Sequence, residues 1–185
     1  PIHKGINIGT FCFPDRSLRE FITRNPQCNF YGADYTNHPQ LIASHPNMKS
    51  INMCIMVDFL GQVAAEGIGT RMVSGAGGQP EFQLGAYFSD GGQGITVLTS
   101  ARKAKDGSLI SSIVPTLPAG TPVTVPRTFV DTVVTEYGVA KLKAMSQRQR
   151  CEALINISHP DLRGQLREEA RRIFNHKPVA YNYEV

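Results

Sequence analysis

The chain of 185 residues lacks the features of membrane and secreted proteins. No apolar run reaches the roughly 18 residues that a membrane helix needs, and no secretory leader opens the sequence. Cysteine is scarce and has no metal-site spacing, so we expect no metal and read the cysteines as reduced, mostly buried thiols of a cytoplasmic protein. A cysteine nucleophile would need a histidine partner, which the sequence does not identify. The four cysteines are Cys12, Cys28, Cys54 and Cys151.

Neither sign of charge predominates strongly in the chain. The 19 lysines and arginines and 15 aspartates and glutamates leave a formal net charge of +4. This excess is spread along the chain and is too weak to indicate nucleic-acid binding, although a mildly basic surface suits an anionic ligand. The composition is that of an ordinary globular protein, and the chain is long enough to bury a sizeable core.

Two phosphate-binding signatures are absent. The chain has no Gly-x-Gly-x-x-Gly motif and no Gly-Lys-Ser/Thr motif, so a Rossmann or P-loop interpretation has no support. It has instead a glycine-rich stretch, Ser74-Gly75-Ala76-Gly77-Gly78, followed by a helix predicted over Gln79–Phe88 with Pro80 just inside it. The backbone N–H groups of such a loop can hold a phosphate, a carboxylate or a developing oxyanion. A tight turn between a strand and a helix is the simpler alternative.

The apolar periodicity predicts one α/β domain, with an open mixed sheet and flanking helices. Alternating apolar residues from Met48, followed by a turn at Gly61-Gln62, predict a hairpin over Met48–Ile68. A short helical turn is predicted over Val139–Lys143. Capping patterns predict one helix starting at Ser17 and another running from Ser146 to Ile157. Further strands are predicted over Ile2–Phe13, Cys28–Tyr35, Gly94–Ser100, Leu109–Val114 and Val130–Thr135, with a last helix from His159-Pro160-Asp161.

Five motifs resemble the acetyl-CoA hydrolase/transferase family, the group of the 4-hydroxybutyrate, acetate and succinate CoA-transferases. They occur in the family's order and extend over nearly the whole chain. The resemblance implies that residues 1–185 form a single domain, similar to the C-terminal one of two related open α/β domains. Family chains are much longer, so we expect an N-terminal domain outside this sequence. The motifs are Ser74–Phe82, Lys105-Asp106-Gly107, Ile113-Val114-Pro115, Val133–Ala140 and Ile157–Arg163.

The activity implied by the resemblance is a ping-pong transfer of CoA between an acyl-CoA and a small carboxylic acid, such as 4-hydroxybutyrate or acetate. A glutamate attacks the acyl-CoA to give an anhydride, and the CoA thiolate then forms a glutamyl-CoA thioester. The family's glutamate falls before the matched part, so no nucleophile is assigned and this chain alone is expected to be inactive. The implied partners are acyl-CoA, the carboxylic acid and the N-terminal domain, within a homo-oligomer.

The resemblance assigns three residues to the catalytic centre. Gly78 matches a glycine whose N–H helps to hold the oxyanion, and Asn37 matches an asparagine near the reacting carboxylate. Glu136 matches a carboxylate that orients the site. From the residues alone, Asn37 is a plausible helix cap and Glu136 a surface residue, although α/β sheets place their sites at strand ends.

CoA itself is expected to bind as a substrate at the glycine loop. The resemblance assigns CoA contacts to Ser74 and Lys105, and the loop geometry adds Gly75, Gly77 and Gly78. By composition, Lys105-Asp106-Gly107 is also typical of a solvent-exposed turn. Two other functions stay open at this point. One is acyl-CoA hydrolysis, and the other is a non-catalytic CoA-binding module that lacks the nucleophile domain.

Overall fold

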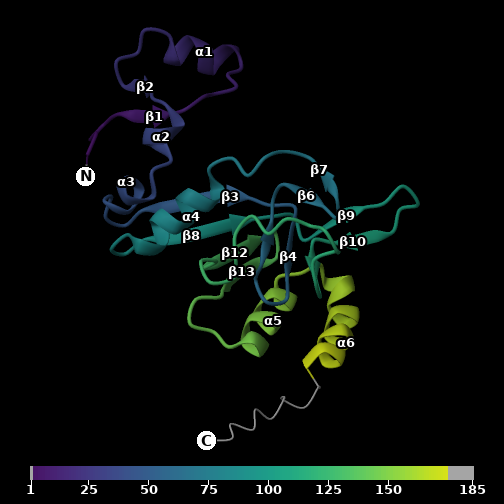
Figure 1. Cartoon of the computed structure of the whole chain (residues 1–185). Coiled ribbons are helices and arrows are strands. Elements are labelled where there is room, and N and C mark those ends of the chain that lie inside the picture. The colour runs from purple at the N-terminus through teal and green to yellow at the C-terminus, as the bar shows by residue number, and fades with distance from the viewer. Residues whose placement is uncertain (1, 175–185) are drawn as a thin grey trace, which may run out of the picture.

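A four-stranded mixed sheet organises the fold in the computed structural model, which describes residues 2–174 (Figure 1). Its strand order is β13-β12-β8-β3. Strands β3, β8 and β12 are parallel, and β13 returns antiparallel beside β12. The open mixed sheet and the α/β class are confirmed. The strands are β3 (Lys49–Met53), β8 (Gln93–Val97), β12 (Thr132–Thr135) and β13 (Gly138–Lys141).

The helices that pack on this sheet lie on one of its faces. Helix α4 (Gln79–Phe88), which begins and ends as predicted, lies against β8 and β3. Its Gln83 Nε2 donates to Thr96 Oγ1 at 3.2 Å. A Cβ atom added to Gly94 would lie 1.8 Å from Gln83 Oε1, so this close approach requires glycine. Helix α5 (Gln147–Asn156) packs against β13 and starts at the predicted capping box of Ser146, and α6 (Arg163–Phe174) packs on α5.

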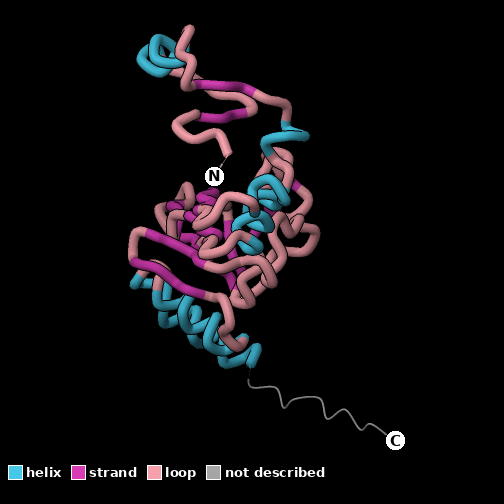
Figure 2. The backbone as a smooth tube through the Cα atoms, turned by 90° about the vertical axis from the view of Figure 1, so that its left-hand side faces the viewer, coloured by secondary structure: helices cyan, strands magenta, loops and turns pink. Residues whose placement is uncertain are grey.

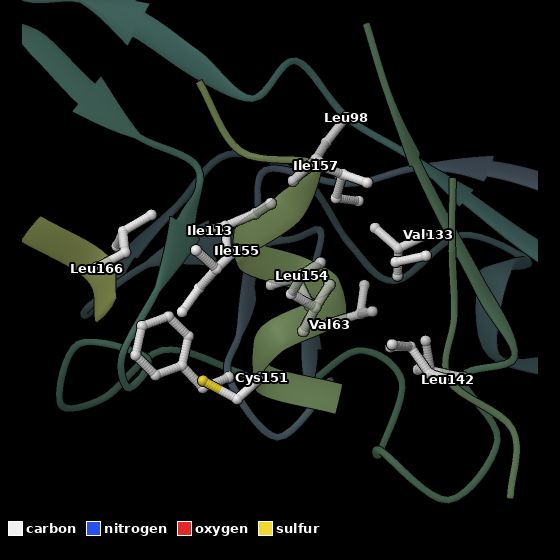
Figure 3. Packing of buried hydrophobic residues seen from close by; sticks show 14 of the residues in the cluster. Val63, Leu98, Ile113, Val133, Leu142, Cys151, Leu154, Ile155, Ile157 and Leu166 are labelled. Atoms are coloured by element: carbon white, nitrogen blue, oxygen red, sulfur yellow. The ribbon is translucent and has the colours of Figure 1, made fainter. Parts of the chain in front are cut away.

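The core lies between this face of the sheet and α5 (Figure 3). Leu154 and Ile155 of α5 are fully buried, and Figure 3 shows them among side chains of the two main sheets and the loops beside them. Val133 and Leu142 approach from one side and Ile113 from the other. Each such side chain contributes about 1.5–3 kcal/mol when it leaves water.

The opposite face of the sheet carries apolar side chains that no helix covers within residues 2–174. We call this surface the bare sheet face. The strand register shows which alternate residues of each strand belong to it. Ile51, Met53 and Val139 are 68%, 78% and 59% exposed. Parallel strands are normally covered on both faces. The apolar residues of the bare sheet face are Ile51, Met53, Ile95, Val97, Val134 and Val139.

The hairpin predicted over Met48–Ile68 is wrong. Its first half, β3, pairs with β8 in the main sheet, and only β4 (Met56–Asp58) folds back onto β5 (Val63–Ala64). The chain changes sheets between two neighbouring residues. The Cys54 N–H donates to the Val97 carbonyl, whereas the Ile55 N–H donates to the Ala64 carbonyl. The alternating pattern continues through this crossing, so periodicity alone does not reveal it.

The second sheet has the order β11-β4-β5, with β11 formed by Ile113–Val114. The single strand predicted over Leu109–Val114 is therefore divided, because β10 (Leu109–Ser111) pairs instead with β9 (Ala101–Lys103) in a hairpin. The helical turn predicted over Val139–Lys143 is wrong. These residues begin in β13, whose backbone pairs with β12. A further small hairpin joins β6 (Gly67–Ile68) to β7 (Arg71–Met72).

The first part of the chain forms an arm that stands away from the main sheet (Figures 1 and 2). It pairs β1 (Asn7–Gly9) with β2 (Cys28–Phe30) in parallel and carries α1 (Arg16–Ile22). The N-cap of α1 is Asp15, whose carboxylate accepts from the Leu18 N–H at 2.8 Å, and not Ser17 as predicted. Helices α2 (Ala33–Thr36) and α3 (Pro39–Ala43) lead from the arm to β3. Nowhere in residues 2–174 is a helix sufficiently long and apolar to span a membrane.

Candidate active site

A cavity of about 450 Å³ lies where the arm meets the start of α4. The arm contributes residues 8–11 to its wall, and the α2 segment contributes Thr36 and Asn37. Asn52 enters from the carboxyl end of β3, and Gly77, Gly78 and Phe82 enter from the glycine loop and α4. We call this space the Asn37–Gly78 cavity. It brings together segments that are up to 74 residues apart in sequence, from residue 8 to residue 82.

The glycine loop joins β7 to α4 and leaves its amides free. The Ser74 N–H donates to the Glu66 carbonyl at 3.1 Å, which anchors the start of the loop. Gly77 has a φ of +59°, a conformation that favours glycine, and Gly78 is the N-cap of α4. In the part of the chain that the structure describes, the backbone N–H groups of residues 75–79 have no hydrogen-bond acceptor. They lie at the positive end of the helix dipole, which favours a negatively charged group.

Asn37 lies directly against Gly78. A Cβ atom added to Gly78 would be 2.6 Å from Asn37 Nδ2, so this contact requires glycine although the φ of Gly78 is an ordinary −101°. The Asn37 Oδ1 atom accepts from the Thr36 hydroxyl at 2.9 Å. With its oxygen toward Thr36, the amide presents its NH₂ group to Gly78. The Asn37 amide NH₂ and the free N–H groups of Gly77 and Gly78 therefore belong to the wall of one cavity, an arrangement suited to stabilising an oxyanion.

Glu136 lies outside this cavity, at the carboxyl end of β12. Its carboxylate accepts from the Ser100 N–H at 2.9 Å and from the Ser100 hydroxyl at 2.7 Å. Desolvation raises the pKa of Glu136, but the two hydrogen bonds from Ser100, together with a favourable charge effect of His159, outweigh it and hold the pKa below the ordinary value. Glu136 is therefore ionised at neutral pH and ties the end of β12 to the segment after β8.

Lys105 also lies outside the cavity, in the exposed turn of the β9–β10 hairpin. The turn is held by Asp106, whose carboxylate accepts from the Ser108 hydroxyl at 2.6 Å and from its N–H at 3.0 Å. These two bonds lower the pKa of Asp106. Gly107 follows with a φ of +84°. Within residues 2–174, Lys105 forms no ion pair, so its ammonium group is available to an anionic ligand.

The structure thus brings together three of the predicted site residues, Asn37, Gly77 and Gly78, and leaves the other four outside the cavity. Those four are Ser74, Gly75, Lys105 and Glu136. Sequence reasoning missed other cavity residues from the arm, from α2 and from α4, such as Thr10, Thr36 and Phe82. Asn52 could have been found from its place near the carboxyl end of a parallel strand, where α/β sheets carry their sites.

Two of the four cysteines are unsuited to nucleophilic chemistry. All four are free thiols. Burial raises the pKa of Cys54 to about 12 and that of Cys151 to about 11, and Glu152 contributes to the second shift. Such thiols are protonated at neutral pH and are poor nucleophiles. The described residues also contain no group of three or more His, Cys, Asp or Glu side chains that could hold a metal ion.

The fold and the site together define a class: an α/β protein whose free backbone amides and asparagine, at the start of a helix, can hold an anion or an acyl oxygen. Comparison with known families identifies the family within this class. The model of the acetyl-CoA hydrolase/transferase C-terminal domain matches residues 15–170. The chain therefore belongs to the acetyl-CoA hydrolase/transferase family, as its motifs predicted.

Two curated relatives and one solved structure illustrate this membership. The chain is 46% identical over 171 residues to the succinyl-CoA:cyclohexane-1-carboxylate CoA transferase of Geobacter metallireducens, covering 92% of this chain and 38% of the relative. It is 44% identical over 174 residues to the 4-hydroxybutyrate coenzyme A transferase of Clostridium kluyveri, covering 94% and 40%. The crystal structure of a 4-hydroxybutyrate CoA-transferase from Porphyromonas gingivalis superposes with a TM-score of 0.74 at 39% identity, covering 94% of this chain and 39% of that one. The chain thus spans about two fifths of the length of these proteins.

Proposed function

We propose that this chain is the C-terminal, CoA-binding part of a CoA-transferase that moves CoA between an acyl-CoA and a small carboxylic acid. The observation that carries the proposal is the Asn37–Gly78 cavity, found in a chain of this family. Its size is adequate for an acyl group and the reactive end of a pantetheine arm, since ligand pockets typically measure about 300–1,000 Å³. The CoA-transferase names of the relatives support the same activity.

The proposed chemistry has a carboxylate attack the thioester carbonyl, which places negative charge on the carbonyl oxygen. The Gly78 N–H and the Asn37 amide are the groups that would donate to this oxygen. Collapse of the tetrahedral intermediate breaks the C–S bond, releases CoA as a thiolate and leaves an acyl-glutamyl anhydride. Attack of the thiolate on the glutamyl carbonyl of the anhydride then expels the acyl carboxylate and forms the glutamyl-CoA thioester.

The attacking glutamate is expected outside this sequence, in the remainder of a longer protein. Glu136 is assigned a supporting part, because its carboxylate is already engaged by Ser100 rather than directed into the cavity. Hydrolysis is the second candidate, since the family includes acetyl-CoA hydrolases. The two activities differ in which acceptor, water or a carboxylate, resolves the glutamyl-CoA thioester.

Transfer of label from acetate into acetyl-CoA tests the proposal. The purified chain alone should show no exchange, whereas a longer protein that includes the expected N-terminal domain should. In that longer protein, Asn37→Ala should lower kcat by roughly 10²–10³, the usual effect of losing one oxyanion donor. Asn29→Ala, on β2 and outside the cavity wall, is the matched control.

The outcomes separate the candidates. Release of free CoA in water with no transfer to acetate would favour the hydrolase, and CoA binding without either reaction would favour the non-catalytic module. Exchange by the chain alone would mean that one of its own carboxylates is the nucleophile, and Glu136 would be the first to test. An Asn37→Ala variant with an unchanged kcat would remove the Asn37–Gly78 cavity from the mechanism.

A further inference from the structure

A second hollow, of about 440 Å³, lies at the other edge of the main sheet. Strands β3, β8 and β12 are parallel, and the Asn37–Gly78 cavity lies at their carboxyl edge, where α4 starts. The second hollow is lined by Tyr87 near the end of α4, by Arg127 before β12, and by Lys143 after β13. These positions all lie at the amino edge of the parallel strands. We call this hollow, completed by Ser146 and Arg150, the basic pocket.

Two of the three cations of the basic pocket are held in place by the fold. The Arg150 Nη1 atom donates to the Arg127 carbonyl at 2.9 Å and to the Leu60 carbonyl at 3.4 Å, and Nε donates to the Met145 carbonyl at 3.3 Å. The Lys143 Nζ atom lies 4.9 Å from the centre of the Tyr87 ring, within cation–π range. Neither charge can therefore turn away from the pocket without losing these contacts.

The positive charge of the basic pocket is not balanced by the protein. No aspartate or glutamate lines it. In the described part of the chain, Arg127, Lys143 and Arg150 form no ion pair with a carboxylate. Burial and the nearby charge of Arg127 both lower the pKa of Arg150, so these two guanidinium groups repel each other. A bound anion would remove that repulsion.

We propose that the basic pocket binds a phosphoryl group, either as inorganic phosphate or as the phosphate of a small nucleotide. Phosphate carries about 1.5–2 negative charges at neutral pH, which suits three gathered cations better than the single charge of a carboxylate. The hydroxyl of Thr128, which also lines the pocket, supplies a neutral donor. The site is separate from the cavity at Gly78, because the two open at opposite edges of the sheet.

Titration of an isotope-labelled longer protein that includes the expected N-terminal domain with inorganic phosphate, followed by NMR at constant ionic strength, tests this proposal. Saturable shifts are expected at the amides of Thr128, Lys143 and Ser146. Arg127→Gln and Lys143→Gln should each weaken phosphate binding at least tenfold, because each removes a charge-assisted contact. Lys141→Gln is the matched control, since it removes the same charge from an exposed position on β13 outside the pocket wall and should bind as the parent does.

Parallel titrations with AMP, adenosine and acetate identify the ligand class. AMP that binds more tightly than phosphate indicates a nucleotide, and AMP that binds equally indicates the free phosphate. Equal affinities for the parent, Arg127→Gln, Lys143→Gln and Lys141→Gln would overturn the proposal, because binding would then be non-specific. So would the absence of saturation, or acetate binding as tightly as phosphate. None of these results bears on CoA binding at Gly78, so failure here leaves the proposed function standing.

Discussion

Replacement of Gly78 by alanine separates a role in catalysis from a role in forming a turn. Gly78 has φ −101° and ψ 7°, which alanine adopts without strain, so the backbone conformation does not demand glycine. Glycine is needed at this position because of the neighbouring Asn37 side chain. The new Cβ would lie 2.6 Å from Asn37 Nδ2, 3.2 Å from its Cγ and 3.3 Å from Phe82 Cδ2. The asparagine amide must therefore move, and its hydrogen bond to Thr36 moves with it.

The expected effects on stability and on rate differ in size. Alanine at an N-cap without a side-chain bond, together with the displacement of one side chain, should lower the free energy of unfolding by no more than about 1 kcal/mol. Misalignment of the Asn37 donor and the Gly78 N–H should cost ~2.7–4 kcal/mol in the transition state, or about 10²–10³ in kcat. The rate should thus fall far more than the stability does.

The assay compares kcat for CoA exchange, measured in a longer protein that includes the expected N-terminal domain, with the Tm of the same variant. Two neighbouring glycines provide controls. Gly75→Ala should change neither quantity, because an added Cβ meets nothing within 4 Å and φ is not positive. Gly77→Ala should lower the free energy of unfolding by about 1 kcal/mol, because its φ is +59°. Since Gly77 lines the Asn37–Gly78 cavity, this variant calibrates the stability cost of the loop rather than the rate.

The result that would refute this reasoning is a folded Gly78→Ala enzyme with an unchanged kcat. Gly78 would then be a structural glycine, and the amides at the start of α4 would not contact the reacting oxygen. A double variant, Gly78→Ala with Asn37→Ala, adds a further check because it removes the clash. If displacement of Asn37 is the cause, the double variant should be no slower than Asn37→Ala alone.

Three further predictions concern other parts of the chain. Lys105→Ala should weaken CoA binding by about 1–3 kcal/mol if its ammonium contacts a CoA phosphate, and calorimetry showing an unchanged affinity would remove Lys105 from the site. Because the folded pKa of Glu136 is depressed, its stabilising effect is full above the ordinary glutamate pKa of about 4.3 and is lost as the pH falls through the folded value. Glu136→Gln should therefore flatten the acid limb of the stability–pH curve, and an unaltered limb would contradict the assignment. Ala144, with a φ of +61°, is strained, so Ala144→Gly should raise the free energy of unfolding by about 0.5–1 kcal/mol, which thermal melts can detect.

The fold could be predicted where local chemistry decides it. Helices α4 and α5 begin where Pro80 and the Ser146 capping box indicate, because both signals depend on residues within one turn. The errors occur where tertiary pairing decides. The alternating segment through Cys54 and Ile55 changes sheets at a single peptide bond, and only the positions of Val97 and Ala64 determine that crossing. No pattern within the segment contains this information.

The site was predictable to the extent that one loop contains it. The glycine loop is contiguous, so its free amides could be anticipated from the sequence. Asn37 came only from the family resemblance, because its contact with Gly78 spans 41 residues and depends on how α2 and the arm approach α4. The arm's share of the cavity, such as Thr10, had no local signal at all. The basic pocket could not be predicted from the sequence either, since Tyr87, Arg127 and Lys143 belong to three separate segments.

The bare sheet face bears on how the domain behaves during synthesis. A surface with Ile51, Met53 and Val139 exposed in one plane favours self-association whenever it meets water. Domains fold as units and in order from the N-terminus, and this one belongs to a family defined by its C-terminal position. In a longer chain, whatever precedes the domain would already be folded when these strands pair. We therefore expect the separately produced domain to aggregate more readily than a longer protein in which another domain covers this face.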